Sequence, residues 1–260
     1  MNVAGSPCED RCLTAASPRA ASLAPMRTQT PACASWRAIS NPMPLFAPVT
    51  SAMRKMPRQA RASATLEAIL EATIQVLLAT GTARLTTTRV AERAGVSVGT
   101  MYQYFPNKQA LLYAVTGRYL DIVADSVERA CREQHGAPVV RMADALVEAY
   151  WNAKIVRCDV TRALYRVAAE VNTASLFEDF SKRMEIATAA MFASASDAEF
   201  ADLAIVNLTL LTSIFGTVRS LFDRRLPQPW SCGVQQQLIF MCRSYLEAAK
   251  TPLEQRSETL

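Results

Sequence analysis

Apolar side chains recur at helical spacing from about residue 60 onward. The first stripe, at spacings of three and four, is Leu66, Ile69, Leu70, Thr73, Val76 and Leu77. This pattern predicts a helix over about 60–79. Gly81 follows it and is expected to close the helix, because glycine readily adopts the left-handed conformation found just past a helix end.

The long pattern then breaks, and hydroxyl and glycine residues predict a short helix and a tight turn. Thr86 and Thr87 are good N-cap residues for a helix that ends at Ala94. Gly95 supplies the unusual backbone conformation that a tight turn needs. Val96 is expected to point into the core.

A second short helix and a long one follow directly. Ser97 is expected to cap a helix that runs through Tyr104. Pro106 ends this helix, since proline cannot continue it, and Asn107 can cap a long helix that begins at Lys108.

The rest of the chain predicts five or more longer helices. Pro138 is expected at the first position of one helix, Asp159 caps a second, and Asp197 caps a long apolar helix over 197–222. Their apolar stripes are Met142, Leu146, Ala149, Ala153 and Val156; Leu164, Val167, Ala168 and Val171; and Phe177, Phe180, Met184, Ala187 and Met191.

The C-terminal part adds a loop and a final helix. Two prolines and a glycine predict a loop over 224–233, and a helix is expected over 233–249. The uncharged segment 203–218 is sixteen residues long, short of the ~20 that a membrane span requires. We therefore expect a buried helix there and no membrane association.

These elements predict an all-α protein with two domains. An N-terminal three-helix domain that contains a helix-turn-helix covers 57–107, and a larger helical domain covers 108–250. Residues 1–56 are expected to be a disordered or mis-assigned extension, and residues 251–260 a flexible tail.

The N-terminal extension allows two interpretations. Residues 1–52 are rich in Ala, Ser, Pro and Thr, nearly free of acids, and superficially similar to an organelle transit peptide. Alternatively, translation begins near Met53, and this second interpretation is the one we favour.

Charge is unevenly distributed along the chain. Residues 53–110 carry eight basic and three acidic side chains, net +5, whereas residues 111–260 carry sixteen and eighteen, net −2. A basic module joined to a slightly acidic one indicates a polyanionic partner for the first.

Composition argues against an enzyme and against a metal or cofactor site. His135 is the only histidine, so a Ser-His-Asp triad, a Cys-His pair or a zinc site has almost nothing to draw on. The cysteines are odd in number, form no CxxC pair and are expected to be reduced thiols in a cytoplasmic protein. They are Cys8, Cys12, Cys33, Cys131, Cys158, Cys232 and Cys242.

Two short helices joined by a glycine turn within a basic segment are typical of a helix-turn-helix, whose second helix lies in the major groove of DNA. Thr100 can reach a base edge, and Val98 and Gly99 allow a close approach. Tyr102, Tyr104 and Lys108 can donate to phosphate oxygens.

Residues 85–112, LTTTRVAERAGVSVGTMYQYFPNKQALL, resemble the signature of the TetR family of transcriptional regulators. Because Val98 and Gly99 are poor hydrogen-bonding residues, base discrimination is expected from Thr100, Gln103 and apolar contact with thymine methyl groups. The DNA contacts implied by the resemblance are Thr87, Thr88, Val98, Gly99, Thr100, Tyr102, Tyr104 and Lys108.

The resemblance also implies a homodimer that pairs through helices near 198–222 and 233–249. We expect a repressor that binds a near-palindromic operator on double-stranded DNA and is released by a small, apolar effector. The alternative is a helical DNA-binding protein without ligand control, whose C-terminal domain only dimerises.

An aromatic and methionine stripe is the candidate effector pocket, although ordinary core packing produces the same pattern. Its expected lining residues are Tyr150, Trp151, Tyr165, Phe177, Phe180 and Met184.

Overall fold

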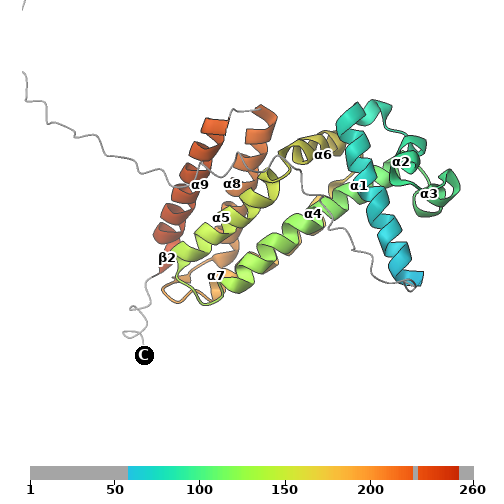
Figure 1. Cartoon of the computed structure of the whole chain (residues 1–260). Helices are drawn as coiled ribbons and strands as arrows, with labels where there is room; N and C mark the ends of the chain where they lie inside the picture. Colours follow the sequence, from blue (N-terminus) through green and yellow to red (C-terminus); the bar gives the residue numbers. More distant parts are fainter. Residues whose placement is uncertain (1–57, 225–227, 252–260) are drawn as a thin grey trace, which may run out of the picture. The chain divides into compact units, whose positions relative to one another are not determined.

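The computed structural model describes residues 58–224 and 228–251 (Figure 1). The predicted N-terminal extension, residues 225–227 and the tail beyond residue 251 lie outside the described residues. The helices are α1 (Arg58–Arg84), α2 (Thr87–Ala94), α3 (Val98–Tyr104), α4 (Lys108–Glu133), α5 (Val139–Ile155), α6 (Cys158–Glu170), α7 (Ala174–Ala193), α8 (Leu203–Arg224) and α9 (Gln228–Ala249). Helices dominate, so the predicted all-α class is confirmed.

The first helix is interrupted at the predicted glycine. Gly81 has φ 72° and ψ 174°, which is not helical, and α1 resumes after it as far as Arg84. The sequence thus located the break, but the extra turn beyond it was not predicted.

Helix α4 runs from the short helices α2 and α3 to the C-terminal helices (Figure 1). Its first half packs against α1, and along its length it packs against α5, α6 and α7. Its buried face includes Leu111, Val115, Leu120, Val123 and Val127, at spacings of three, four and five. This apolar face makes α4 the shared wall of the short-helix region and the C-terminal bundle.

Two predicted helix starts were placed one or two residues away from the observed ones. Pro138 is the N-cap of α5 and not its first helical residue. Asp159 lies inside the first turn of α6, whose N-cap is Arg157. An Asp159 oxygen lies 3.7 Å from Nε of Arg157, so this carboxylate faces a neighbouring cation instead of capping the backbone.

The predicted cap at Asp197 was wrong for its own helix. Helix α8 begins at Leu203, and Asp202 caps it by accepting the N–H of Ile205 at 3.1 Å. Asp197 instead accepts the N–H of Val139 at 2.8 Å and so satisfies the first turn of α5. A capping carboxylate does not have to serve the helix that follows it in sequence.

A two-stranded antiparallel pairing, also not predicted, brings the start of α8 to the end of α9. Strand β1 (Glu199–Phe200) pairs with β2 (Lys250–Thr251), with Phe200 opposite Lys250. Lys250 adds ion pairs to Asp197 at 3.4 Å and to Glu247 at 2.7 Å. Thr251 therefore belongs to a strand and not to the predicted tail.

Part of the loop expected over 224–233 is helical, because α8 extends to Arg224 and α9 begins at Gln228. Pro229 lies in the first turn of that helix, where its missing N–H costs nothing. Proline was read as a loop signal although it also marks the beginning of helices.

Buried polar contacts fix α8 against α7. Thr188 and Asn207 are both almost fully buried, and their side-chain oxygens are 2.7 Å apart. The amide of Asn207 also donates to the Glu185 carbonyl at 3.0 Å. Since buried polar groups need partners, these bonds fix how the two helices pack.

Candidate functional site

The turn between α2 and α3 is built around a left-handed glycine. Gly95 has φ 69° and ψ 28°, as its predicted role requires. Its N–H donates to the Glu92 carbonyl at 3.3 Å, and the N–H of Val96 donates to the Ala91 carbonyl at 3.0 Å. These two bonds form a Schellman motif that satisfies the last carbonyls of α2 and sets the direction of the chain that follows.

Helix α3 is short but fixed at its start and along its inner face. The Ser97 hydroxyl accepts the N–H of Thr100 at 3.0 Å and lies 2.8 Å from its hydroxyl oxygen. Met101 is fully buried and Phe105 is 7% exposed, so both belong to the core. The predicted cap at Ser97 is confirmed.

The outer side of α3 is open to solvent. Val98 is 40% exposed and Tyr102 52% exposed, and Gly99 and Gln103 are also exposed. Their spacing places all four on one side of the helix. We call these four residues the α3 face; Thr100, at its edge, is half-buried.

The two threonines predicted as contacts at the start of α2 differ in environment. Thr88 is exposed, whereas Thr87 is buried and its hydroxyl donates to the Tyr102 phenol oxygen at 3.4 Å. This contact holds the start of α2 beside the α3 face.

Tyr104 and Lys108, the other predicted contacts, make hydrogen bonds within the protein. The Tyr104 phenol donates to the Ala62 carbonyl at 3.4 Å, and the ammonium of Lys108 donates to the Thr82 carbonyl. An ammonium has three N–H donors, so Lys108 keeps others for a phosphate. Both residues also connect α3 and α4 to α1.

Three arginines near this surface are not among the DNA contacts predicted from the sequence. Arg84 and Arg89 are exposed on either side of the α2 cap, and a guanidinium nitrogen of Arg89 donates to the Arg84 carbonyl at 2.8 Å. Arg93 is exposed as well, with its Nε bonded to Gln75 at 2.6 Å. The available signal was the net charge of +5 over residues 53–110, to which all three contribute.

A second candidate site is a cavity of about 280 Å³ within the C-terminal helices. Four of the predicted pocket residues line it: Tyr150, Tyr165, Phe177 and Phe180. The other two, Trp151 and Met184, are buried but do not line it. The remaining lining residues are Leu120, Lys154, Ser181, Phe215, Gly216 and Arg219.

The unexpected member of this cavity is Lys154, whose residue is only 1% exposed. Its Nζ lies 4.7, 5.5, 5.4 and 5.9 Å from the ring centroids of Tyr119, Tyr150, Tyr165 and Phe180. Burial, and secondarily the positive charge of Arg219, lowers the pKa of Lys154 from 10.5 to about 7.

A hydrogen-bond chain fixes the backbone at Lys154. The Thr161 hydroxyl donates to the Lys154 carbonyl at 2.7 Å, so its single proton is used there. The Tyr119 phenol must therefore be the donor in its bond to the Thr161 oxygen. Burial raises the pKa of Tyr119 far above its usual value, so the phenol keeps its proton.

Arg219 of α8 lies at the exposed edge of the cavity. Its guanidinium carbon is 4.1 Å from the Tyr165 ring centroid, and its Nε is 3.2 Å from a carboxylate oxygen of Asp223. The side chain is 44% exposed. The cavity thus has one deeply buried and one solvent-facing cation.

A sequence signal for Lys154 existed but was not used. Val147, Tyr150 and Trp151 form a buried stripe on α5, and Lys154 continues it at the next helical step. A lysine that continues an apolar helical stripe lies either at the end of the buried region or inside it.

The pattern of the family described as bacterial regulatory proteins, tetR family, matches residues 69–115. This match covers the second half of α1, the whole helix-turn-helix and the first turns of α4. Residues 69–115 of this chain therefore carry the N-terminal pattern of the TetR family. The matched family consists of regulators and not of enzymes.

A curated TetR-type relative is the HTH-type transcriptional repressor KstR of Mycolicibacterium smegmatis. It is 34% identical over 135 residues, which cover 50% of this chain and 63% of KstR. The chain therefore matches less than two thirds of that relative's length.

Solved TetR-type structures share the fold. One from Mesorhizobium loti has a TM-score of 0.62 at 15% identity, covering 75% of this chain and all of the other. SmeT, the repressor of the Stenotrophomonas maltophilia multidrug efflux pump SmeDEF, has a TM-score of 0.54 at 21% identity, covering 72% and 90%. At these identities the similarity establishes the fold alone.

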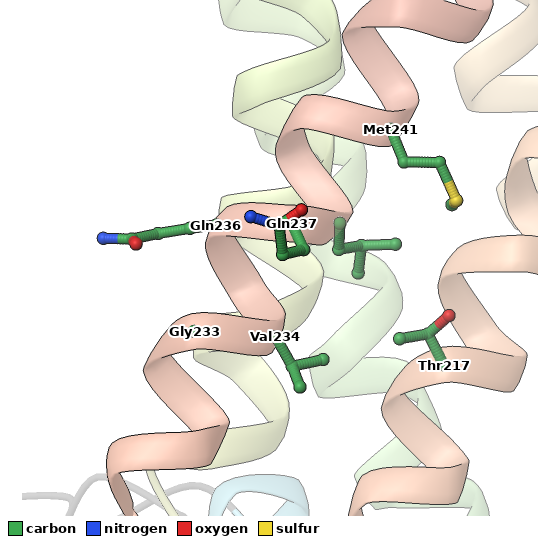
Figure 2. Close-up of a pocket in the computed structure, with 7 residues that line it drawn as sticks. Thr217, Gly233, Val234, Gln236, Gln237 and Met241 are labelled. Atoms are coloured by element: carbon green, nitrogen blue, oxygen red, sulfur yellow. The ribbon is translucent and has the colours of Figure 1, made fainter. Parts of the chain in front are cut away.

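A groove of about 550 Å³, larger than the aromatic cavity, lies between α8 and α9 (Figure 2). Thr217, Val234, Gln237 and Met241 are among its lining residues. Apolar side chains on the same two helices are exposed: Ile205 61%, Leu208 53%, Phe240 66% and Met241 43%. We call these four residues the α8–α9 face.

Among residues 58–224 and 228–251, no cluster of three His, Cys, Asp or Glu side chains is arranged to hold a metal ion. Burial raises the pKa of Cys131 to about 11 and that of Cys242 to about 12, which disfavours the reactive thiolate. Cys158 is exposed.

Two described helices are long and apolar enough to cross a membrane by composition: Ala60–Arg84 and Leu203–Arg224. In each, 39% of the apolar window is buried inside the protein. The core helices of soluble proteins meet the same criterion, so it does not identify a membrane span.

Proposed function

We infer that the protein is a cytoplasmic transcriptional repressor that binds double-stranded DNA through the α3 face. The observation that carries this proposal is an exposed helical face held by a Schellman turn and a serine cap within a basic segment. A major groove about 12 Å wide admits one helix. The relative KstR is named a transcriptional repressor.

The α3 face and the neighbouring Thr100 and Lys108 divide into base-reading and phosphate-binding positions. Gln103 and Thr100 offer hydrogen bonds to base edges, and Val98 an apolar contact for a thymine methyl group. Tyr102 and Lys108 are suited to phosphate, because their donors carry no base preference. Arg84 and Arg89 add positive charge at the start of α2.

Dimerisation is proposed through the α8–α9 face. No charged residue occurs from Leu203 to Val218, and exposed Ile205 and Leu208 lie on that stretch. Together with Phe240 and Met241 they form an apolar surface of the kind that marks protein interfaces. Two copies joined there would present two α3 faces to successive major grooves, about 34–36 Å apart.

Release by an effector is proposed to act through α4. Leu120 of α4 lines the cavity, and Lys108 at the start of the same helix is bonded to the end of α1. Twelve residues of helix separate them, roughly 18 Å. Glu170 of α6 also accepts a hydrogen bond from Thr82 at 2.7 Å, a second connection between the bundle and α1. SmeT, which shares the fold, has been solved in complex with triclosan.

The DNA-binding proposal is tested by selecting duplexes from random sequence and measuring affinity by fluorescence anisotropy. We expect selection of a near-palindrome and an affinity that falls steeply with salt, because phosphate contacts release counterions. Thr100→Ala should change the preferred base, whereas Tyr102→Phe should weaken all sequences alike.

Tyr113→Phe is the matched control, because Tyr113 is also exposed but bonds to Ser175 on α7. No binding to any duplex at low salt would refute the proposed function.

The dimer proposal is tested with Phe240→Glu, which places a charge in the α8–α9 face. Analytical ultracentrifugation should show a monomer, and operator affinity should fall by about two orders of magnitude because one half-site is lost. Ile186→Glu is the control, since Ile186 is 63% exposed on α7. An unchanged dimer after Phe240→Glu would exclude this interface.

Ligand control is tested by thermal melting with a panel of small apolar and amphipathic compounds. A compound that raises the melting temperature should weaken operator binding, and the operator should weaken its binding by the same factor. If no compound that binds affects DNA affinity, the C-terminal domain only dimerises.

A further inference from the structure

The charged side chains that line the aromatic cavity are both positive. Lys154 and Arg219 both line it, and no acidic side chain does so within the described part of the chain. Asp223 pairs with Arg219 outside the lining. An apolar molecule would fill this space without providing a partner for Lys154.

Lys154 has no carboxylate partner among residues 58–224 and 228–251, although it is buried. Aromatic faces compensate for a buried ammonium only in part, by ~0.5–2 kcal/mol per contact, whereas desolvation costs several kcal/mol. The cavity therefore holds an amine whose charge is incompletely balanced until an anion enters.

We propose that the effector is a small amphipathic monoanion whose carboxylate pairs with Lys154 Nζ while its apolar body packs against Phe177, Phe180 and Phe215. This rests on the proposed function, because it takes the cavity to be the effector site. The rings of Phe180 and Phe215 are 5.7 Å apart between centroids, and Tyr150 is 4.8 Å from Phe215. Arg219 at the edge attracts the same anion.

The size of the cavity restricts the class of acid. About 280 Å³ is at the lower end of the ~300–1,000 Å³ typical of small-molecule sites. An aromatic or medium-chain carboxylate fits such a volume. The hydroxyls of Tyr150, Tyr165 and Ser181 can donate to the second carboxylate oxygen.

Binding must be coupled to protonation of Lys154. At pH 8 this amine, with a pKa of about 7, is mostly neutral in the free protein, so pairing with a carboxylate takes up nearly one proton from solvent. Affinity should then fall about tenfold per pH unit between pH 8 and 9.

The groups that face Lys154 do not interfere with this titration. Tyr119 from α4, Tyr150 from α5 and Tyr165 from α6 all have pKa values raised by burial, so the phenols keep their protons. Helix α7 contributes Phe180 and Ser181 to the cavity, and α8 contributes Arg219, paired with Asp223.

The experiment is isothermal titration of the full chain with two matched pairs: 2-naphthoate against 2-naphthamide, and octanoate against 1-octanol. Each acid should bind at least tenfold more tightly than its neutral partner. The binding enthalpies measured in phosphate and in Tris at pH 8 should differ, because the buffer supplies nearly one proton. The difference should be close to the difference between the ionisation enthalpies of the two buffers. Equal affinities, no proton uptake, or no binding by either acid at millimolar concentration would overturn the proposal.

Lys154→Met should remove the preference for acids and the proton uptake while neutral compounds still bind. Lys182→Met is the matched control, because Lys182 is exposed on α7, and it should change neither. If Lys154→Met does not fold, the proton uptake measured with the unmodified protein tests the proposal instead. Operator binding without acid preference would refute this inference alone, whereas absence of DNA binding would refute the proposed function and leave the acid preference measurable.

Discussion

The helix-turn-helix and the aromatic cavity differ in how their residues come together. The hydrogen bonds that cap the helices at the turn join residues close in sequence, such as Gly95 to Glu92 and Ser97 to Thr100. The cavity instead brings together side chains of α4, α5, α6, α7 and α8. The first site is specified by local backbone chemistry, and the second by the packing of distant helices.

This difference determines whether the polar groups of each site find hydrogen-bond partners. In the turn, polar groups cap helix ends and are satisfied by backbone partners. In the cavity, Lys154 is buried among aromatic rings, and no carboxylate of residues 58–224 and 228–251 forms an ion pair with it. The capping groups of the turn stabilise the fold, whereas the buried Lys154 destabilises it, as the proposed ligand site predicts.

The largest effect is expected from Lys154→Met measured without ligand. The folded pKa of about 7 is below the unfolded value of 10.5, so unfolded chains bind more protons between these values and wild-type stability rises with pH there. The variant should be more stable by up to about 5 kcal/mol at pH 6, and its advantage should shrink by about 1.4 kcal/mol per pH unit above 7.

Urea unfolding at pH 6, 7, 8 and 9 checks this prediction, with Lys182→Met as the control whose effect should be small and independent of pH. A wild type that is more stable than Lys154→Met at pH 6 would show that the aromatic rings satisfy the ammonium fully. The contrast between the two sites would then be lost.

How far the sequence predicts each site follows from the same contrast. Thr86, Ser97 and Asn107 were recognised as caps because each accepts a backbone N–H three residues later in the chain. The signal at Asp197 was equally good locally, yet its partner is Val139, 58 positions away in sequence. No local pattern distinguishes these two uses of a carboxylate.

The cavity was predicted only in part for a related reason. Aromatic residues at helical spacing indicated burial, so Tyr150, Tyr165, Phe177 and Phe180 were found, but which of them face a void depends on α8. Lys154 was missed because lysine is ordinarily a surface residue. Its burial arises only when Tyr119 and Tyr165 close around it from other helices.

The second largest effect is expected from Gly95→Val. No atom lies within 4 Å of an added Cβ, so the cost is confined to the backbone strain of a β-branched residue at φ 69°. We expect a loss of about 2 kcal/mol and weaker operator binding, since the angle of α3 depends on this turn.

Gly95→Asn is the matched variant, because asparagine tolerates the left-handed region, and most of the loss should be recovered. Denaturant unfolding and anisotropy measure the two effects. If Val and Asn were equally destabilising, space and not backbone conformation would limit this position.

A smaller effect is expected from Ser97→Ala, which removes the N-cap of α3. The N–H of Thr100 loses its acceptor, and stability should fall by about 1 kcal/mol. Ser97→Asp, which retains a capping oxygen, should keep the stability but weaken DNA binding by placing a negative charge beside the α3 face. An equal loss of stability in both variants would argue against capping.

The smallest effect on stability is expected from Gly99→Ala, and its sign is opposite. Gly99 lies in α3, and an added Cβ would meet nothing closer than the Ser97 hydroxyl at 3.8 Å, so alanine should stabilise the helix by about 0.5–1 kcal/mol. The same methyl group would project from the α3 face into the groove. Thermal melting and anisotropy on one preparation should therefore show a higher melting temperature together with weaker binding to every duplex. Higher stability with unchanged affinity would mean that DNA does not approach the backbone at Gly99, and would leave Gln103 and Tyr102 to account for the contact.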